Sequence, residues 1–94
     1  MAIKSIKHKG LRRLYVHGDS RGVHAAFVDK LRDMLLALDS ATTVEEVETV
    51  PGWRLHPLKG DLRGVWSMSI SGNWRLVFRF DDGDAFDLDL TDYH

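Results

Sequence analysis

Residues 64–80 read GVWSMSISGNWRLVFRF and decide the fold, because apolar and polar side chains alternate on both sides of a Ser-Gly-Asn turn. Alternation with a period of two is typical of a strand that buries one face. The apolar side chains of the two segments share that face only if residue 70 lies opposite residue 74. The pattern therefore predicts two antiparallel strands joined by the three-residue loop Ser71-Gly72-Asn73.

A second hairpin follows, because residues 85–91 alternate in the same way. We expect the loop Asp82-Gly83-Asp84, since a two-residue Asp82-Gly83 turn would place an aspartate opposite each apolar side chain. The four expected strands are Trp53–Pro57, Gly64–Ile70, Asn73–Phe80 and Ala85–Thr91. Their polar face then carries His56, Ser67, Ser69, Arg75, Val77, Arg79, Asp87, Asp89 and Thr91.

Helical spacing of apolar residues precedes these strands. A short strand is expected at Ile3–Lys7, then a helix that ends at Gly18, and then a main helix that starts at Val23. Thr42 or Thr43 with Glu45 or Glu46 resembles a capping box of a further short helix. The chain is thus predicted to be one α+β domain, residues 1–94, with two main N-terminal helices on a twisted, mainly antiparallel sheet of four to five strands. The apolar residues expected to join sheet and helices are Trp66, Trp74, Phe78, Phe86 and Leu88 against Phe27, Leu31 and Leu35.

The composition limits the possible functions. The chain has no cysteine, which excludes disulfides, thiolate catalysis and zinc sites with sulfur ligands. No apolar run reaches the length of a membrane span and no signal peptide is visible at the start, so a cytoplasmic protein is expected. The net charge of -1 hides a basic start and an aspartate-rich end. A basic segment favours a local contact with a phosphate backbone, although an ordinary solvated surface explains it as well.

Several kinds of catalytic site lack their sequence signals. There is no His-x-x-x-His pair, no calcium-loop pattern, no Gly-x-Ser-x-Gly elbow and no Walker motif, so we expect neither a metal nor a cofactor. Histidines, arginines and lysines nevertheless suit RNA cleavage by the 2'-hydroxyl, which needs a base, an acid and cations around the phosphate. His56 could equally be a structural strand residue, and Arg75 or Arg79 could be cross-strand partners of Asp87 and Asp89.

Four blocks in order resemble one known family. They are residues 3–11 (IKSIKHKGL), residues 55–61 (LHPLKGD), residues 64–67 with 72–75 (GVWS and GNWR), and residues 83–94, which end in Asp92-Tyr93-His94. These blocks resemble the HigB toxins, or plasmid-maintenance killer proteins, of the RelE/ParE superfamily. The resemblance covers nearly the whole chain.

The resemblance implies a RelE-like microbial RNase fold and the activity of a ribosome-dependent mRNA interferase. It implies a HigA-type helix-turn-helix antitoxin as partner, the ribosomal A site and mRNA as targets, and operator DNA only through the antitoxin. The catalytic residues that it implies are His56, Asp92, Tyr93 and His94, and the RNA phosphate contacts are Lys59, Arg63 and Arg75. Ribosome docking by the basic residues Lys7, Lys9, Arg12 and Arg13 is a further expectation.

Two other functions remain open at this stage. A catalytically weak HigB-like chain would act mainly as a corepressor that binds its antitoxin on operator DNA. A third possibility is a HigB-like scaffold that cleaves free RNA without the ribosome. Growth arrest in the absence of antitoxin separates the enzyme from the corepressor, and cleavage of naked RNA identifies the third function.

Overall fold

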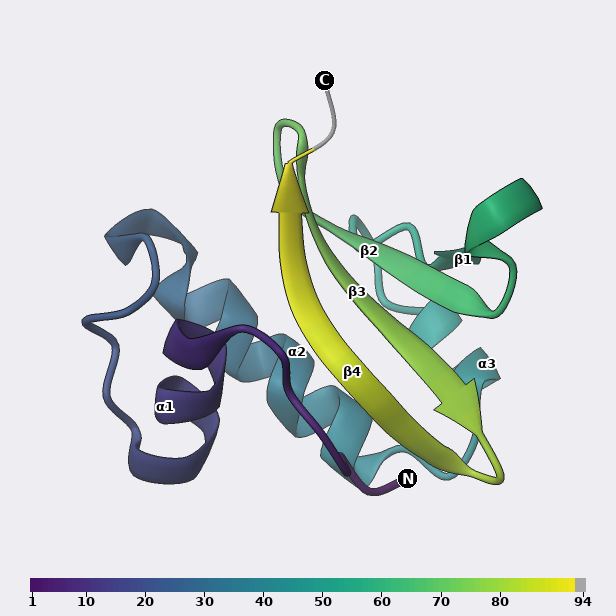
Figure 1. The fold of residues 1–94 in the computed structure, drawn as a ribbon, viewed down its shortest axis with the longest axis horizontal. Coiled ribbons are helices and arrows are strands. Elements are labelled where there is room, and N and C mark those ends of the chain that lie inside the picture. The colour runs from purple at the N-terminus through teal and green to yellow at the C-terminus, as the bar shows by residue number, and fades with distance from the viewer. Residues whose placement is uncertain (93–94) are drawn as a thin grey trace.

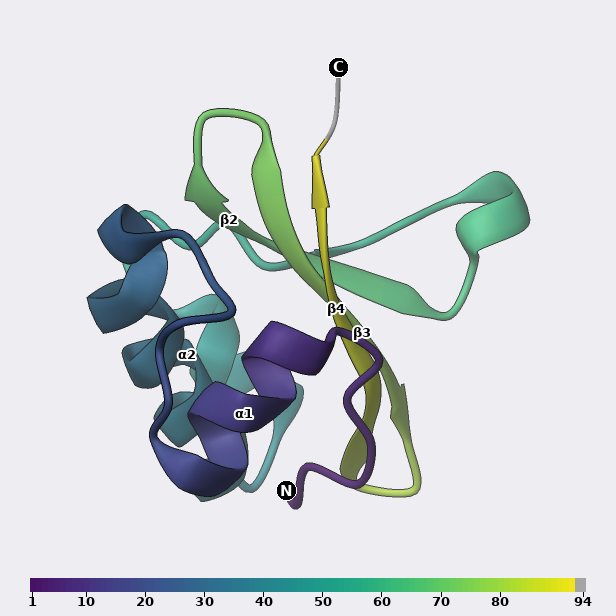
Figure 2. The ribbon, with the colours of Figure 1, turned by 60° about the vertical axis from the view of Figure 1, so that its left-hand side comes forward.

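The computed structural model describes residues 1–92 and places the helices α1 and α2 on one side of a four-stranded antiparallel sheet, as Figures 1 and 2 show. The strands follow one another across the sheet in chain order: β1 (His56–Pro57), β2 (Val65–Ser71), β3 (Trp74–Asp81) and β4 (Asp84–Asp92). The expected α+β class and antiparallel sheet are confirmed. The side of the sheet that faces away from these helices carries His56.

The helices begin and end where local chemistry satisfies their free backbone groups. Helix α1 (Lys9–His17) starts after His8, whose Nδ1 accepts a hydrogen bond from the Leu11 amide, and it stops at Gly18 with a φ of 69°. The main helix starts later than expected, because residues 25–27 form a 3-10 turn, η1 (Ala25–Phe27), before α2 (Val28–Ser40). Helix α3 (Val44–Glu48) is preceded by Thr42, whose amide and hydroxyl both donate to Glu46.

The core lies between α2 and the sheet. Met34 and Leu38 of α2 are fully buried, as are Met68, Leu76 and Leu88 of the three long strands. Two of the aromatic anchors expected from the sequence are different in the structure: Trp74 is 38% exposed, and Phe86 is only partly buried and lies outside the core cluster. Both differences come from the hairpins, whose registers change near the turns.

The first hairpin has the expected register over most of its length, since Trp66 pairs with Phe78 and Met68 with Leu76. The pairing then shifts between Ser69 and Ser71, so that Ser71 lies opposite Trp74. The expected three-residue loop is therefore wrong: the turn has two residues, Gly72 and Asn73, and a bulge in β2 precedes it. Lys30 stabilises this bulge, because its Nζ donates a hydrogen bond to the Ile70 carbonyl at 2.8 Å.

In the second hairpin the expected three-residue loop Asp82-Gly83-Asp84 is wrong as well. The structure has the two-residue Asp82-Gly83 turn that the alternation argued against. Asp81 pairs with Asp84, which leaves Asp82 (φ 48°) and Gly83 (φ 82°) as a two-residue turn with the positive φ angles of type I′. Leu76 still pairs with Leu90, because the register shifts between Val77 and Arg79 at a bulge in β4. The bulge contains Asp87, with a φ of 54°. It lets the tight turn and the apolar pairing coexist, and it moves Phe86 to the same face as Arg79.

The N-terminal residues cover the outer edge of β4. The expected strand at Ile3–Lys7 is reduced to two parallel bridges, Ile3 with Ala85 and Ile6 with Leu88. Between them Ser5 supports the bulge: its Oγ accepts from the Asp87 amide at 2.8 Å and donates to the Asp87 carboxylate at 3.2 Å. This arm, residues 2–7, satisfies backbone groups that an exposed edge strand would leave open.

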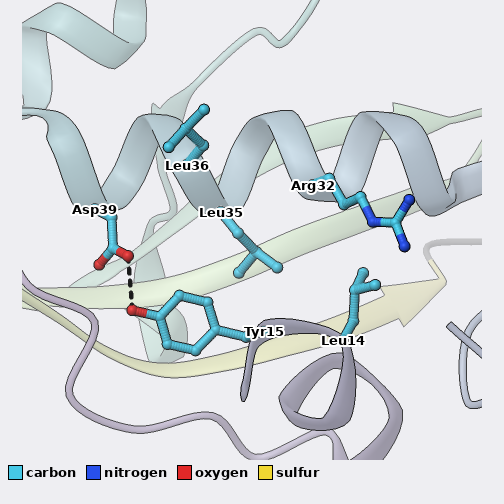
Figure 3. Close-up of a pocket in the computed structure, with 6 residues that line it drawn as sticks. All are labelled: Leu14, Tyr15, Arg32, Leu35, Leu36 and Asp39. Carbon is cyan, nitrogen blue, oxygen red and sulfur yellow. Dashed lines mark hydrogen bonds between the residues drawn. The ribbon is translucent and has the colours of Figure 1, made fainter. Parts of the chain in front are cut away.

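A hydrogen bond links the two long helices at the surface. The Tyr15 hydroxyl of α1 donates to the Asp39 carboxylate of α2 at 2.7 Å, above a shallow pocket that Leu14 and Leu35 also line (Figure 3). Because the phenol is the donor in this bond, Asp39 raises the pKa of Tyr15 to about 12. Within residues 1–92, no helix has the length and apolar character needed to cross a membrane.

Phe78 and Phe86 provide a test of the bulge in β4. Phe78→Ala should lower the free energy of unfolding by about 3–5 kcal/mol, because Phe78 is buried in the core. Phe86→Ala should cost clearly less, since the bulge takes that ring off the helix-facing side. Chemical denaturation of both variants measures the difference. Equal losses would show that β4 has no bulge and that both rings face the helices.

The Tyr15 bond should make a pH-dependent contribution to stability. The folded-state pKa lies above the usual value of 10.0, so the stabilisation is complete below pH 10 and is lost as the pH rises through about 12. Wild type and Tyr15→Phe should therefore differ in free energy of unfolding by a constant amount from pH 7 to 9. The difference should shrink above pH 10. Asp39→Ala should abolish this pH dependence, and a difference that persists unchanged to pH 12 would contradict the assignment.

Candidate active site on the open face of the sheet

The face of the sheet that points away from α1 and α2, here called the open face, carries the polar residues of all four strands. One row across it consists of His56, Ser67, Val77 and Asp89, which are paired in that order from β1 to β4. The next row contains Ser69, Arg75 and Thr91. The structure thus brings His56 and Arg75 to the same face, as the sequence predicted.

His56 is exposed and is oriented by its own chain segment. Its Nδ1 lies 2.8 Å from the carbonyl oxygen of Arg54. A carbonyl only accepts, so the neutral ring carries its hydrogen on Nδ1 and its lone pair on Nε2. Two local features produce this arrangement. Arg54 has a φ of 52°, which interrupts the expected Trp53–Pro57 strand, and Pro57 restricts His56 to extended backbone.

Ser67 is a feature of this face that sequence reasoning placed but gave no role. Among residues 1–92 it is the one polar residue in the buried class, and its Oγ has no hydrogen-bond partner in that part of the chain. Leaving a buried hydroxyl unpaired costs about 1–3 kcal/mol. The signal in the sequence was only its alternation with Trp66 and Met68, which does not separate a buried serine from an exposed one.

The expected phosphate contacts occupy two different places. Lys59 and Arg63 flank the short 3-10 helix η2 (Gly60–Leu62) in the loop between β1 and β2, and both are exposed. This loop projects from the sheet on the side away from the helices (Figure 2). Arg75 lies at the β2–β3 turn, where its Nη1 donates to the carbonyls of Gly72 at 2.7 Å and Trp74 at 3.0 Å. The structure thus places Lys59 and Arg63 in the loop after β1, and Arg75 on β3.

Arg79 is a cross-strand partner of Asp87, which is one of the two aspartates that the sequence offered for this role. Its Nε lies 3.8 Å from the Asp87 carboxylate, and both side chains are partly exposed. Such a long, solvated ion pair stabilises the protein little. Arg79 therefore adds a positive charge to the open face near the start of β2, where it pairs with Val65.

The C-terminal triplet is only partly described. Asp92 is the last described residue and lies opposite Trp74 at the end of β4. Trp74 packs against Phe27 on the helix side, with ring centroids 6.0 Å apart, so strand alternation gives Asp92 the same side. It is separated from His56 by three strand spacings and by three residues along β4, because Asp89 is the residue in the His56 row; the two Cα atoms are thus roughly 17 Å apart. Tyr93 and His94 lie outside the described residues.

The basic residues expected to dock on the ribosome lie away from the open face. Lys7 precedes α1, and Lys9, Arg12 and Arg13 belong to it; all four side chains are exposed. Helix α1 lies on the same side of the sheet as α2, which is the side opposite the open face (Figure 2). Within residues 1–92, no three histidine, aspartate or glutamate side chains converge as a metal site requires.

Comparison with known sequences points to one family. The family model for the RelE-like toxin of the type II toxin-antitoxin system HigB matches residues 4–94. The endoribonuclease HigB of Proteus vulgaris is 48% identical over 92 residues, which is 98% of this chain and 99% of that protein. The similarity thus includes the segments around His56 and Arg75 as well as the C-terminal triplet.

Solved structures with the same fold are more distant in sequence. YafQ from E. coli strain BL21(DE3) has a TM-score of 0.61 at 14% identity, with 96% of this chain and 90% of that chain covered. The YoeB-YefM complex from Staphylococcus aureus has a TM-score of 0.61 at 21% identity, with 100% and 97% covered. These likenesses establish the fold. The family match over residues 4–94 and the 48% identical relative show that the chain belongs to the HigB family of RelE-like toxins of type II toxin-antitoxin systems.

Proposed function

We propose that this toxin is an endoribonuclease that cleaves messenger RNA on the ribosome and so stops translation. The observation that carries the proposal is His56, an exposed histidine whose Nδ1–H is held by a carbonyl at 2.8 Å and whose Nε2 is left to take a proton. The 48% identical relative named endoribonuclease HigB supports the same activity. A toxin of this family acts with an antitoxin as its partner.

The reaction needs no group beyond the RNA and the protein. His56 Nε2 takes the proton of a ribose 2'-hydroxyl, and the oxygen attacks the adjacent phosphorus. The bond from phosphorus to the 5'-oxygen then breaks, and an acid gives that oxygen a proton. The products are a 2',3'-cyclic phosphate and a 5'-hydroxyl. His94 is the proposed acid, and Tyr93 orients the nucleotide by stacking or through its hydroxyl. Asp92, which was expected to share the acid role, lies on the helix side of the sheet and too far from His56 to protonate the same bond.

Cations stabilise the charge that builds up on the phosphate in the transition state. Lys59 and Arg75 have this role in the proposal, and Arg63 adds a contact to the flanking backbone. Arg75 is suited to it, because two carbonyls of its own hairpin hold one side of its guanidinium at 2.7 and 3.0 Å. A guanidinium with few accessible rotamers loses less entropy when it binds a phosphate.

Binding to the ribosome is proposed to use a second surface. Lys7, Lys9, Arg12 and Arg13 present their charges on the helix side of the molecule, so they can contact ribosomal RNA while the open face receives the mRNA in the A site. The antitoxin is proposed to be of the HigA helix-turn-helix type, and operator DNA is contacted through it. The protein acts in the cytoplasm under this proposal.

A variant that lacks the base and a variant that lacks the acid should differ in how their cleavage rate depends on the leaving group of the substrate. His56→Ala and a chain that lacks His94 should both fail to arrest growth and to cleave ribosome-bound mRNA. A substrate with a 5'-thio leaving group needs no acid, so it should restore cleavage to the His94 deletion and leave His56→Ala inactive. Rescue of His56→Ala alone would reverse the two roles. Growth arrest by both variants would remove both residues from the site.

The docking surface should show itself in the salt dependence of ribosome binding. Neutralising Lys7, Lys9, Arg12 and Arg13 together should weaken binding and reduce the slope of log K against log salt by roughly 3, if each residue contacts one phosphate. Arg21→Gln is the control, because its guanidinium is paired with Asp19 at 2.9 Å. An unchanged slope in the fourfold variant would exclude this surface from the ribosome contact.

A further inference from the structure

Trp74 is an aromatic side chain that the fold leaves in contact with solvent. It is 38% exposed, and within residues 1–92 it is the one exposed tryptophan, tyrosine or phenylalanine. The other exposed large apolar side chains in that part of the chain, Val16, Leu36 and Leu62, are aliphatic. A single exposed aliphatic residue is ordinary in a folded protein. An exposed indole adds a flat π surface on which another ring can stack.

The indole is supported on its inner side. Phe27 packs against it with ring centroids 6.0 Å apart and 58° between the ring planes, and His24 packs against Phe27 at 4.9 Å and 30°. The adjoining pocket, which Val23 and Leu90 also line, has a volume of about 90 Å³. Pockets that enclose small organic ligands measure roughly 300–1,000 Å³. A ring that binds Trp74 therefore lies on the outer surface of the indole.

Two cations lie beside Trp74, one on each face of the sheet. Lys30 comes from α2 on the helix side, and its Nζ donates to the Ile70 carbonyl at 2.8 Å. Ile70 directly precedes Ser71, the residue that pairs with Trp74. Arg75 lies on the open face, and its Nη1 donates to the carbonyl of Trp74 itself at 3.0 Å. Both side chains have more N–H groups than these bonds use, so each can also contact a phosphate.

An exposed aromatic ring between cations matches the chemistry of single-stranded RNA. Proteins bind such strands with aromatic rings that stack on the bases and with positive charges that follow the phosphates. An apolar protein partner would need a wider apolar surface, whereas the chain neighbours of Trp74 are Asn73 and Arg75. The β2–β3 turn therefore suits an RNA strand that passes from the open face around the end of the sheet.

The register gives the distance of this ring from the proposed base. Trp74 is three residues along β3 from Val77, which lies in the His56 row, and β3 is two strand spacings from β1. The Cα atoms of Trp74 and His56 are thus roughly 14 Å apart. A base that stacks on Trp74 belongs to a different nucleotide from the one whose 2'-hydroxyl reacts at His56.

We propose that Trp74 binds the messenger RNA by stacking on the base of a nucleotide outside the reacting one, while Lys30 and Arg75 contact the adjoining phosphates. This inference rests on the proposed function, because it takes mRNA to lie on the open face. Trp74 has no part in proton transfer. Every base has a π face, so the ring contributes affinity and position without selecting a sequence.

The test measures binding of the toxin to ribosomes that carry an mRNA with 2'-O-methyl groups around the A site, which prevent cleavage. One nucleotide at a time is made abasic, so that it keeps its sugar and phosphate but has no base. At one position the loss of the base should weaken binding of wild type about tenfold, which corresponds to one base–aromatic stack. Trp74→Leu should weaken binding of the intact mRNA by a similar factor. The abasic change at that position should then have little further effect.

Two variants serve as controls. Trp74→Phe keeps a flat ring and should restore the abasic effect. Leu36→Ala is the matched control, because Leu36 is also an exposed apolar residue on the helix side but lies at the pocket between α1 and α2 (Figure 3). It should show the abasic effect of wild type. Equal abasic effects in wild type and Trp74→Leu at every position overturn the proposal, since a merely structural tryptophan lowers the affinity for intact and abasic mRNA alike.

The remaining outcomes separate the proposal from its alternatives. If no abasic position changes the affinity of wild type, no base is stacked on the toxin, and this result requires no variant to fold. If Trp74→Leu weakens the complex with the antitoxin and leaves ribosome binding unchanged, the ring binds the protein partner and the stacking proposal is wrong. The binding assay does not depend on cleavage, so absence of cleavage of ordinary mRNA by wild type overturns only the proposed function.

Discussion

The structure depends on the bulge at Asp87 more than on any other local feature. The Asp82-Gly83 turn and the apolar pairing of Leu76 with Leu90 demand registers that differ by one residue, and an extra residue in β4 reconciles them. Asp87 adopts left-handed backbone to do so, a conformation that aspartate tolerates better than most residues. Ser5 compensates by bonding both the amide and the carboxylate of Asp87. Strand β4, which ends at Asp92, is thus aligned by one residue of the N-terminal arm.

The sequence was most informative where one period governs a whole element. Alternation over residues 64–80 predicted the central pairing and the face that carries His56 and Arg75, because a slip by one residue would expose every apolar side chain. Helix α1 ended at Gly18 as expected, since glycine favours the left-handed backbone of that cap. These features follow from strong, repeated local signals.

The sequence failed where two local preferences compete. A strict alternation assigned Phe86 to the core, but the favourable turn at Asp82-Gly83 and the bulge moved it to the other face. Trp74 was expected in the core for the same reason, and it lies at the exposed end of a bulged hairpin. In the candidate site, residue types predicted His56 and Arg75, but neither the Arg54 carbonyl that orients His56 nor the burial of Ser67 has a sequence signal. The first depends on the positive φ of Arg54, and the second depends on packing across strands.

The arm at residues 2–7 joins the first and the last element of the chain. Ser5 of this arm, for example, bonds to Asp87 of β4, which lies 82 residues further along the chain. Contacts of such high sequence separation form last, because the intervening chain must first be ordered. The edge of β4 therefore stays open until this late step, and an open strand edge is a place where two copies of a chain can pair.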